Sequence, residues 1–189
     1  MFIRSERLFL RPGWAEEWEE LLALVDDEQV VRNLARAPWP YTAKDAKAFV
    51  HSHADRAESE RLLPNFFMTL PSADGQRLIG SVGLNRDGDE VELGFWVGRP
   101  FWGQGFATEA ARAVVSLAKA LGHHQLVASH FVDNPASGRV LRKLGFRPTG
   151  VIRDRFSLGR GGTAPASQLR LMLGEGEECD QEMDAMRAA

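Results

Sequence analysis

A glycine-rich stretch from Glu90 to Leu121, EVELGFWVGRPFWGQGFATEAARAVVSLAKAL, carries the first chemical pattern of this chain. Its first part, Val91 to Val97, reads as a strand, and its last part, from about Thr108, has the apolar spacing of a helix. Gly103 and Gly105 lie between the two. Glycines let a main chain approach an anion closely, and the free N–H groups at a helix N-terminus favour negative charge. The pattern therefore predicts a phosphate-binding loop.

A second motif covers Asn134 to Phe146, with the sequence NPASGRVLRKLGF. Asn134 is a favourable N-cap for the helix predicted here, and Gly145 is a favourable residue to end it. These two roles are structural. They leave the Ser137 hydroxyl available for chemistry.

The glycine loop alone is also compatible with a dinucleotide fingerprint, because Gly103-x-Gly105 precedes a helix and Asp133 lies at the end of the following strand. Three features count against that interpretation. Thr108 stands at the third fingerprint position, five residues separate Val97 from Gly103, and the preceding strand belongs to a hairpin meander. A P-loop is excluded because no Gly-Lys-Ser/Thr follows the loop. A glycine loop without a ligand stays open at this point.

The elements that must hold these motifs follow from apolar periodicity and from turn residues. Their order, β-α-α-β-β-β-α-β-α-β-β, predicts an α/β (α+β) fold with a mixed central sheet of about seven strands flanked by about four helices. A helix joins the strands at 91–97 and 125–132, so these two are expected to be parallel. The expected strands span 7–11, 66–70, 78–84, 91–97, 125–132, 147–156 and 168–173. The four expected helices span 14–25, 43–58, 108–121 and 136–144, and residues 27–33 are compatible with a short additional helix.

Composition bounds the class of protein. The chain has 189 residues, a net charge of −3 and a single cysteine, Cys179. This length predicts one domain, which we expect over residues 1–173 and followed by an acidic tail over 174–189. The charge argues against a nucleic-acid partner, and no apolar run approaches the roughly 20 residues of a membrane helix. We expect a cytoplasmic protein, a monomer or homodimer, that engages neither nucleic acid nor a membrane.

Taken together, the strand ELGFWV, the loop WGQGFATEA and the downstream NPAS and KLGF segments resemble the GNAT superfamily of acetyl-CoA-dependent N-acetyltransferases. The segments SERLFLRP and PWPYTAKDAKAFV are also similar to its ribosomal-protein N-terminal acetyltransferase branch. The resemblance covers roughly residues 3–173. It implies a GNAT fold and transfer of an acetyl group from acetyl-CoA, without a metal, to a primary amine of a protein N-terminus or a small molecule. The alternatives are an acyl-CoA-binding module without turnover and an NAD-dependent oxidoreductase.

The resemblance also implies the cofactor contacts. Amides of the glycine loop would hold the CoA pyrophosphate, and an amide near Trp96 or Val97 would stabilise the oxyanion. The strands at 91–97 and 125–132 would splay apart and expose an edge to the pantetheine arm. Arg139, Arg142 and Lys143 are candidates for the adenosine phosphates. The expected cofactor-binding residues are Trp96, Val97, Gly98, Gly103, Gln104, Gly105, Phe106, Ala107, Thr108, Asn134 and Arg142.

Two residues are expected to be catalytic. Ser137 stands where this branch carries its serine, which implies that it donates a proton or hydrogen bond to the departing thiolate. Glu92 lies on a strand face that can border the cleft, and we predict that it is the general base and acts through a water. The alternative is that Glu92 pairs with an Arg or Lys across the sheet. Asp154 and His130 are reserve candidates for the base.

The acceptor pocket is expected to involve aromatic residues upstream of the cofactor motifs. Trp39 and Tyr41 lie in a proline-rich loop that is well placed to line a pocket or to cover the core. Phe66 and Phe67 begin a predicted strand nearby. We predict that Trp39, Tyr41 and Phe66 contact the acceptor.

Overall fold

The computed structural model describes residues 1–54, 62–73 and 75–174. Within these ranges no helix is long and apolar enough to cross a membrane. The chain forms short 3-10 segments at Ala15–Glu17, Arg99–Phe101 and Leu158–Arg160. The α-helices are α1 (Trp18–Val25), α2 (Glu28–Val31), α3 (Ala43–Ala54), α4 (Phe106–Ala120) and α5 (Pro135–Lys143). The strands are β1 (Ile3–Arg4), β2 (Phe9–Arg11), β3 (Asn65–Ser72), β4 (Gly75–Asp87), β5 (Glu90–Val97), β6 (Gln125–Phe131), β7 (Arg147–Ser157) and β8 (Gly162–Met172).

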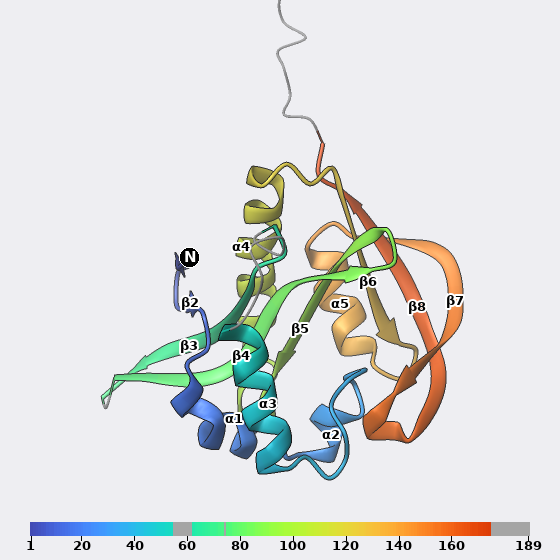
Figure 1. Ribbon diagram of the computed structural model, residues 1–189. Helices are drawn as coiled ribbons and strands as arrows, with labels where there is room; N and C mark the ends of the chain where they lie inside the picture. The colour runs from blue at the N-terminus through green and yellow to red at the C-terminus, as the bar shows by residue number, and fades with distance from the viewer. Residues whose placement is uncertain (55–61, 74, 175–189) are drawn as a thin grey trace, which may run out of the picture.

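The eight strands build one mixed sheet in the order β1-β2-β3-β4-β5-β6-β8-β7 (Figure 1). Strands β5 and β6 are parallel, as the connecting helix α4 predicts, and the other neighbouring pairs are antiparallel. The mixed α/β fold predicted from the sequence is therefore confirmed. The expected seven strands become eight because β1 has only two residues, too few to leave a periodic pattern.

Each face of the sheet carries its own hydrophobic core. Helices α4 and α5 cover one face, where Leu93 of β5 packs with Val114 of α4. Helices α1 and α3 cover the other, where Leu21 and Val50 are buried. In β4, Leu78 belongs to one core and the next residue, Ile79, to the other, and Figure 1 shows the sheet sandwiched between these helical layers. The central strands therefore have both faces buried.

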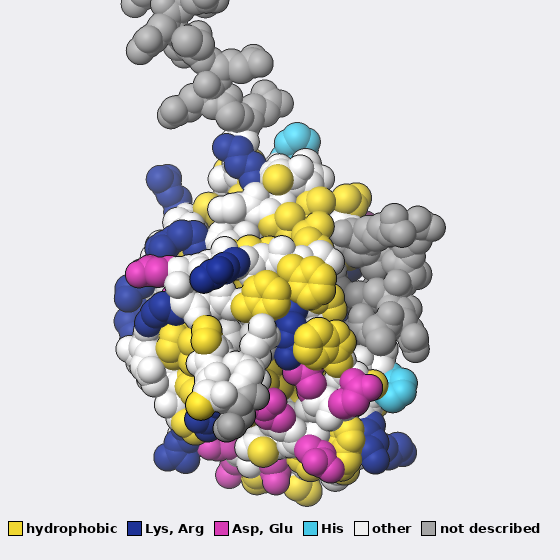
Figure 2. Space-filling view, turned by 90° about the vertical axis from the view of Figure 1, so that its left-hand side faces the viewer, with side chains coloured by type: hydrophobic (Ala, Val, Ile, Leu, Met, Phe, Trp, Pro, Cys, Tyr) yellow, Lys and Arg dark blue, Asp and Glu magenta, His cyan; other side chains and the backbone are white. Residues whose placement is uncertain are grey.

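The N-terminal edge of the sheet is formed by the short strand β1. Figure 2 looks onto this side of the molecule and shows apolar side chains gathered there, with basic and acidic groups around them. Phe2 is exposed at this edge, and its ring stacks on Phe9 with 5.7 Å between the ring centroids. A two-residue outer strand offers few main-chain groups for pairing with another chain.

Several predicted boundaries move. Helix α4 begins at Phe106 instead of Thr108, because Gly105 adopts a left-handed conformation and serves as the N-cap. Strand β8 begins at Gly162 instead of residue 168, since the chain stays extended through Pro165, whose carbonyl accepts a hydrogen bond from the Val132 amide at 2.9 Å. The helix expected from 14 to 25 starts as a 3-10 turn. Residues 55–58 of the helix expected at 43–58 and positions 175–189 of the expected tail lie outside the described residues.

Candidate active site

The glycine loop and the start of α4 form a cradle of main-chain amides. Gly103 and Gly105 have φ values of 75° and 84°, a region that other residues rarely adopt. The first intrahelical bond of α4 runs from the Glu109 amide to the Gly105 carbonyl at 3.0 Å. The amides of residues 106–108 therefore have no acceptor within the helix. The indole of Trp102 donates to the Val97 carbonyl at 2.6 Å and ties this loop to the end of β5.

A cavity of about 410 Å³ opens beside this cradle, between the end of β5 and helix α5. Its size falls in the range of small-molecule sites, roughly 300–1,000 Å³. Eight of the eleven predicted cofactor-binding residues line it, namely Trp96, Val97, Gly103, Gly105, Phe106, Ala107, Thr108 and Asn134.

The other three predicted cofactor residues do not line this cavity. The Gly98 Cα packs against Leu24, so that a Cβ built there would lie 2.7 Å from the leucine Cδ2. The Gln104 side chain turns back to the Pro100 carbonyl at 3.2 Å. Arg142 is exposed on the outer side of α5. Two other basic residues of α5, Arg139 and Lys143, line the cavity instead.

Strand β5 presents an open main-chain edge to the cleft. It pairs with β6 only at Glu92–Val127, so the two strands diverge beyond this point as expected. The Trp96 carbonyl points at β4, because a Cβ on Gly80 would lie 2.2 Å from it. Main-chain groups alternate in direction along a strand. The N–H groups of Phe95 and Val97 therefore face the cleft, and the Trp96 amide does not.

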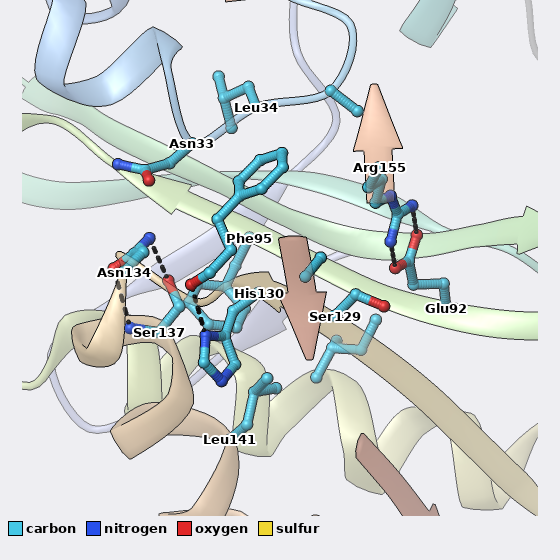
Figure 3. A pocket seen from close by; sticks show the side chains of 14 residues that line it. Asn33, Leu34, Glu92, Phe95, Ser129, His130, Asn134, Ser137, Leu141 and Arg155 are labelled. Atoms are coloured by element: carbon cyan, nitrogen blue, oxygen red, sulfur yellow. Dashed lines mark hydrogen bonds and ion pairs between the residues drawn. The ribbon is translucent and has the colours of Figure 1, made fainter. Parts of the chain in front are cut away.

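A second cavity of about 140 Å³ passes through the gap between β5 and β6. Side chains alternate along β5, so Glu92 lies on the α1–α3 face of the sheet and Phe95 on the α4–α5 face. Figure 3 shows Asn134 and Ser137 at one end of this cavity and the pair of Glu92 and Arg155 at the other. The remaining lining residues are Asn33, Leu34, Ala35, Leu93, Ser129, His130, Phe131, Leu141 and Ala166.

Ser137 is held in place by Asn134 at the start of α5. The Asn134 side-chain amide donates to the Ser137 Oγ at 3.0 Å, and the Ser137 amide donates to the Asn134 Oδ1 at 3.3 Å. The hydroxyl oxygen is thus already an acceptor. Its own proton remains available to donate to a group in the cavity. Asn134 caps the helix as the sequence indicates, and it also orients the serine.

Glu92 is engaged in an ion pair. Both guanidinium nitrogens of Arg155 donate to its carboxylate, with an Nη2–Oε2 distance of 2.6 Å. The side chains of Glu92 and Arg155 are 13% and 31% exposed. Hydrogen bonding to Glu92, opposed by burial, raises the pKa of Arg155 above its ordinary value. The arrangement matches the alternative considered for Glu92, but two of the roughly four lone-pair positions of its carboxylate stay free.

The two reserve candidates have different surroundings. His130 lines the smaller cavity, its Nδ1 bonds the Phe131 carbonyl at 2.8 Å, and its ring packs on Gly138, where a Cβ would lie 2.6 Å from Nε2. Asp154 is exposed and lines neither cavity. Within the described residues, no group of three or more His, Cys, Asp or Glu side chains is arranged to hold a metal ion.

The predicted acceptor residues Trp39, Tyr41 and Phe66 do not line either cavity. Tyr41 is buried in the core beneath α1 and α3, where desolvation, with a smaller effect of Asp45, raises its pKa to about 12. Phe66 is buried in the other core, and Trp39 is exposed. Burial thus gives Tyr41 and Phe66 a packing role, and their contact with an acceptor stays a prediction.

The sequence pattern missed the segment that follows α2. Asn33 and Leu34 line both cavities. The Leu34 carbonyl accepts a hydrogen bond from the Ser157 hydroxyl at 2.7 Å, which pins this segment to the end of β7. Asp133 joins the same region through ion pairs with Arg32 and Arg160. These contacts lower the pKa of Asp133, and the hydrogen bond from Arg160 has the largest effect. No local pattern marks residues 33–35, because distant elements position them.

Comparisons with known proteins agree with this geometry. Residues 7–147 match the model of the acetyltransferase (GNAT) domain family. The N-acetyltransferase YoaA of Bacillus subtilis is 28% identical over 156 residues, which cover 80% of this chain and 86% of YoaA. A GNAT-family acetyltransferase of Bacillus anthracis has a TM-score of 0.75 at 22% identity, with coverage of 93% of this chain and all of that one. RimL, a ribosomal L7/L12 alpha-N-protein acetyltransferase in complex with coenzyme A, has a TM-score of 0.74 at 17% identity, with coverage of 91% and 98%.

Proposed function

Because the chain belongs to the GNAT acetyltransferase family, we propose that it transfers an acetyl group from acetyl-CoA to a primary amine of a protein N-terminus or a small molecule. One observation carries the proposal: the cofactor-sized cavity and the smaller cavity meet. The residues common to both linings are Asn33, Leu34, Phe95, Asn134 and Ser137. A donor entering from the α4–α5 side and an amine entering from the opposite face of the sheet would come together at these five residues.

The residues of the larger cavity fit the cofactor. Amides of residues 106–108 at the N-terminus of a 15-residue helix favour a pyrophosphate, and Arg139 and Lys143 add positive charge across the cavity. The open edge of β5 suits an amide-bearing pantetheine arm, which would pair with the Val97 N–H as an added strand would. RimL, a structural neighbour, is described with coenzyme A bound. Acetyl-CoA supplies the acetyl group as a thioester.

Phe95 and Ser137 take roles at the junction of the cavities. The Phe95 N–H faces the cleft there and donates to the carbonyl oxygen on which negative charge develops. The Ser137 hydroxyl, already accepting from Asn134, donates to the departing sulfur. A serine is a weak acid, so its contribution is a hydrogen bond or a relay through water.

Glu92 is the general base of this proposal. It lies three residues before Phe95 on β5, about 10 Å between Cα atoms, which a glutamate side chain and one water can bridge. Arg155 occupies one side of its carboxylate and keeps it in the acceptor cavity. The remaining lone pairs accept the amine proton through that water.

The test measures thiol release from acetyl-CoA against a panel of small amines, peptides and ribosomal-protein N-terminal peptides. We expect turnover with at least one amine and a fall in kcat of about tenfold or more in Ser137→Ala, the size of a lost hydrogen bond at a reacting atom. Ser116→Ala, at an exposed position of α4, is the matched control. Binding of CoA without thiol release across the panel would favour a non-catalytic acyl-CoA-binding module and overturn the proposal.

A further inference from the structure

The segment between β1 and β2 meets the first turn of α4, about a hundred positions later in the chain. The Glu109 carboxylate accepts hydrogen bonds from the Ser5 hydroxyl at 2.7 Å, from the Arg7 amide at 2.7 Å and from the Arg7 Nε at 2.8 Å. Ser5 also closes its own turn, since its amide donates to the Leu8 carbonyl at 2.9 Å. One carboxylate therefore fixes the N-terminal segment to the start of the helix.

The guanidinium of Arg7 continues from Glu109 onto the glycine loop. Its Nη1 donates to the Gln104 carbonyl at 3.0 Å, and its Cζ lies 4.5 Å from the centre of the Phe106 ring. Its Nη2 is 3.5 Å from the position that a Cβ on Gly105 would occupy. Arg7 thus contacts three consecutive residues of the loop. It lines neither cavity, so these contacts lie on the outer side of the loop.

We propose that Ser5, Arg7 and Glu109 form a clamp that holds the glycine loop in its phosphate-binding conformation. Arg7 is then a positioning residue, because it acts on the cofactor through the loop. The proposal rests on the function proposed above, since it takes CoA as the ligand of the loop.

A physical reason supports the clamp. The loop contains two left-handed glycines, and glycine loses more conformational freedom on ordering than any other residue. An unrestrained loop would have to be ordered when the phosphates bind, at a cost in affinity. Contacts that order it beforehand remove this cost. Partial burial raises the pKa of Glu109, but the hydrogen bonds from Arg7 and Ser5 outweigh it and leave the pKa below its ordinary value, so the carboxylate stays charged at neutral pH.

The clamp differs in its predictions from simple attraction between Arg7 and the phosphates. If Arg7 acted only through its charge, then Glu109→Gln, which removes a nearby negative charge, would strengthen CoA binding. A clamp predicts the reverse: Glu109→Gln and Arg7→Ala each weaken CoA binding. The double variant should then bind CoA no more weakly than the weaker-binding of the two single variants, because both substitutions disrupt the same set of contacts.

The experiment measures the dissociation constant of CoA by calorimetry and the hydrogen–deuterium exchange of the loop peptide in the free protein. In Arg7→Ala and Glu109→Gln we expect about fivefold weaker binding, the upper size for a partly exposed ion pair, together with faster exchange over residues 103–108. Arg7→Lys keeps the charge without the planar fork, so we expect an intermediate value. Arg112→Ala, an exposed arginine one turn further along α4, is the control and should match the wild type.

Three outcomes separate the proposals. Weaker binding in both single variants with an unchanged Arg112→Ala supports the clamp. Unchanged or tighter CoA binding in Glu109→Gln, with a wild type that binds CoA, overturns the clamp and leaves the proposed function intact. A wild type that does not bind CoA overturns the proposed function itself.

Discussion

Two interpretations of Glu92 make different predictions. Glu92 is either the general base, as we propose, or only the ion-pair partner of Arg155. Three variants separate them: Glu92→Gln, Arg155→Met and the double variant. Glu92→Gln removes the proton acceptor and the ion pair together. Arg155→Met removes only the ion pair and keeps an aliphatic chain of similar length. If Glu92 is the base, Glu92→Gln should therefore lose more rate than Arg155→Met.

The magnitudes follow from burial. Exposures of 13% for Glu92 and 31% for Arg155 place the pair between a surface ion pair, worth about 0–1 kcal/mol, and a buried one, whose disruption costs about 3–5 kcal/mol. Arg155→Met leaves the less exposed charge unpaired, so we expect it to lower the free energy of unfolding by about 2 kcal/mol, against about 1 kcal/mol for Glu92→Gln. Loss of a general base costs about 100-fold in rate or more, which is about 2.7 kcal/mol in the barrier.

The assay measures kcat/KM for the best amine of the panel at saturating acetyl-CoA and at one fixed pH for all variants. We expect a loss of about 100-fold in Glu92→Gln and less than about tenfold in Arg155→Met, with the double variant equal to Glu92→Gln. Urea unfolding of each variant shows whether it is folded under the assay conditions. Equal losses in the two single variants, with no further loss in the double variant, would refute the base assignment and leave Glu92 as an ion-pair partner.

Three further predictions use single positions. Tyr41 is the only tyrosine of the chain, so absorbance of its phenolate should appear with a midpoint near pH 12 in the folded protein and near pH 10 in denaturant. Gly105→Ala and Gly122→Ala both place alanine at a φ of 84°, at opposite ends of α4, and should cost a similar 1–2 kcal/mol or so of stability, but only Gly105→Ala should weaken CoA binding. Asp133→Asn should raise KM for the amine several-fold, because the ion pairs of Asp133 hold the segment after α2, which lines the smaller cavity.

Each of these predictions has a result that would contradict it, and for Asp133→Asn this result is an unchanged KM for the amine. A phenolate midpoint near pH 10 before unfolding would mean that Tyr41 reaches solvent. Since its folded pKa is raised, its neutral form stabilises the fold below about pH 10, and this contribution is lost as the pH rises through about 12. Equal CoA affinities in the two alanine variants would show that Gly105 has no specific role in phosphate binding. For Asp133 the folded pKa is lowered, so the contribution of its ion pairs is present above the ordinary carboxyl value and is lost as pH falls through the lowered one.

The fold was predictable where local chemistry sets it. The strand of residues 91–97, the glycine loop and the helix after it lie in one continuous stretch, and their order requires the parallel pair of β5 and β6. Element ends were less predictable. Apolar spacing placed the start of α4 at about Thr108, but the left-handed Gly105 caps the helix, which begins two residues earlier at Phe106. Strand β8 was expected only from residue 168, but the chain is extended from Gly162, and the Pro165 carbonyl takes part in the sheet.

The same distinction between local and distant determinants applies to the residues of the candidate site. The phosphate cradle consists of consecutive residues, so a motif marks it, and the Asn134–Ser137 pair is equally local. Glu92 was recognisable from its strand face, but its partner Arg155 lies 63 positions away and depends on how β8 and β7 join the sheet. Tyr41 shows the converse case: an aromatic residue on a proline-rich loop was compatible with a binding pocket or with a cover over the core, and the loop folds it into the core.

The cavity that we propose for the acceptor is built from distant parts of the chain, and this has a consequence for the proposed function. The smaller cavity combines the segment after α2, the end of β6 and Arg155 of β7, whereas most residues of the larger cavity come from the stretch around α4 and from α5. A substitution at Ala35 can therefore change the shape of the smaller cavity without changing the lining of the larger one. Among the residues that the structure describes, only Asn33, Leu34, Phe95, Asn134 and Ser137 border both cavities. Substitutions at Ala35, which borders the smaller cavity alone, should accordingly change which amines are accepted. Substitutions at Asn134 should instead change the KM for the amine and the KM for acetyl-CoA together.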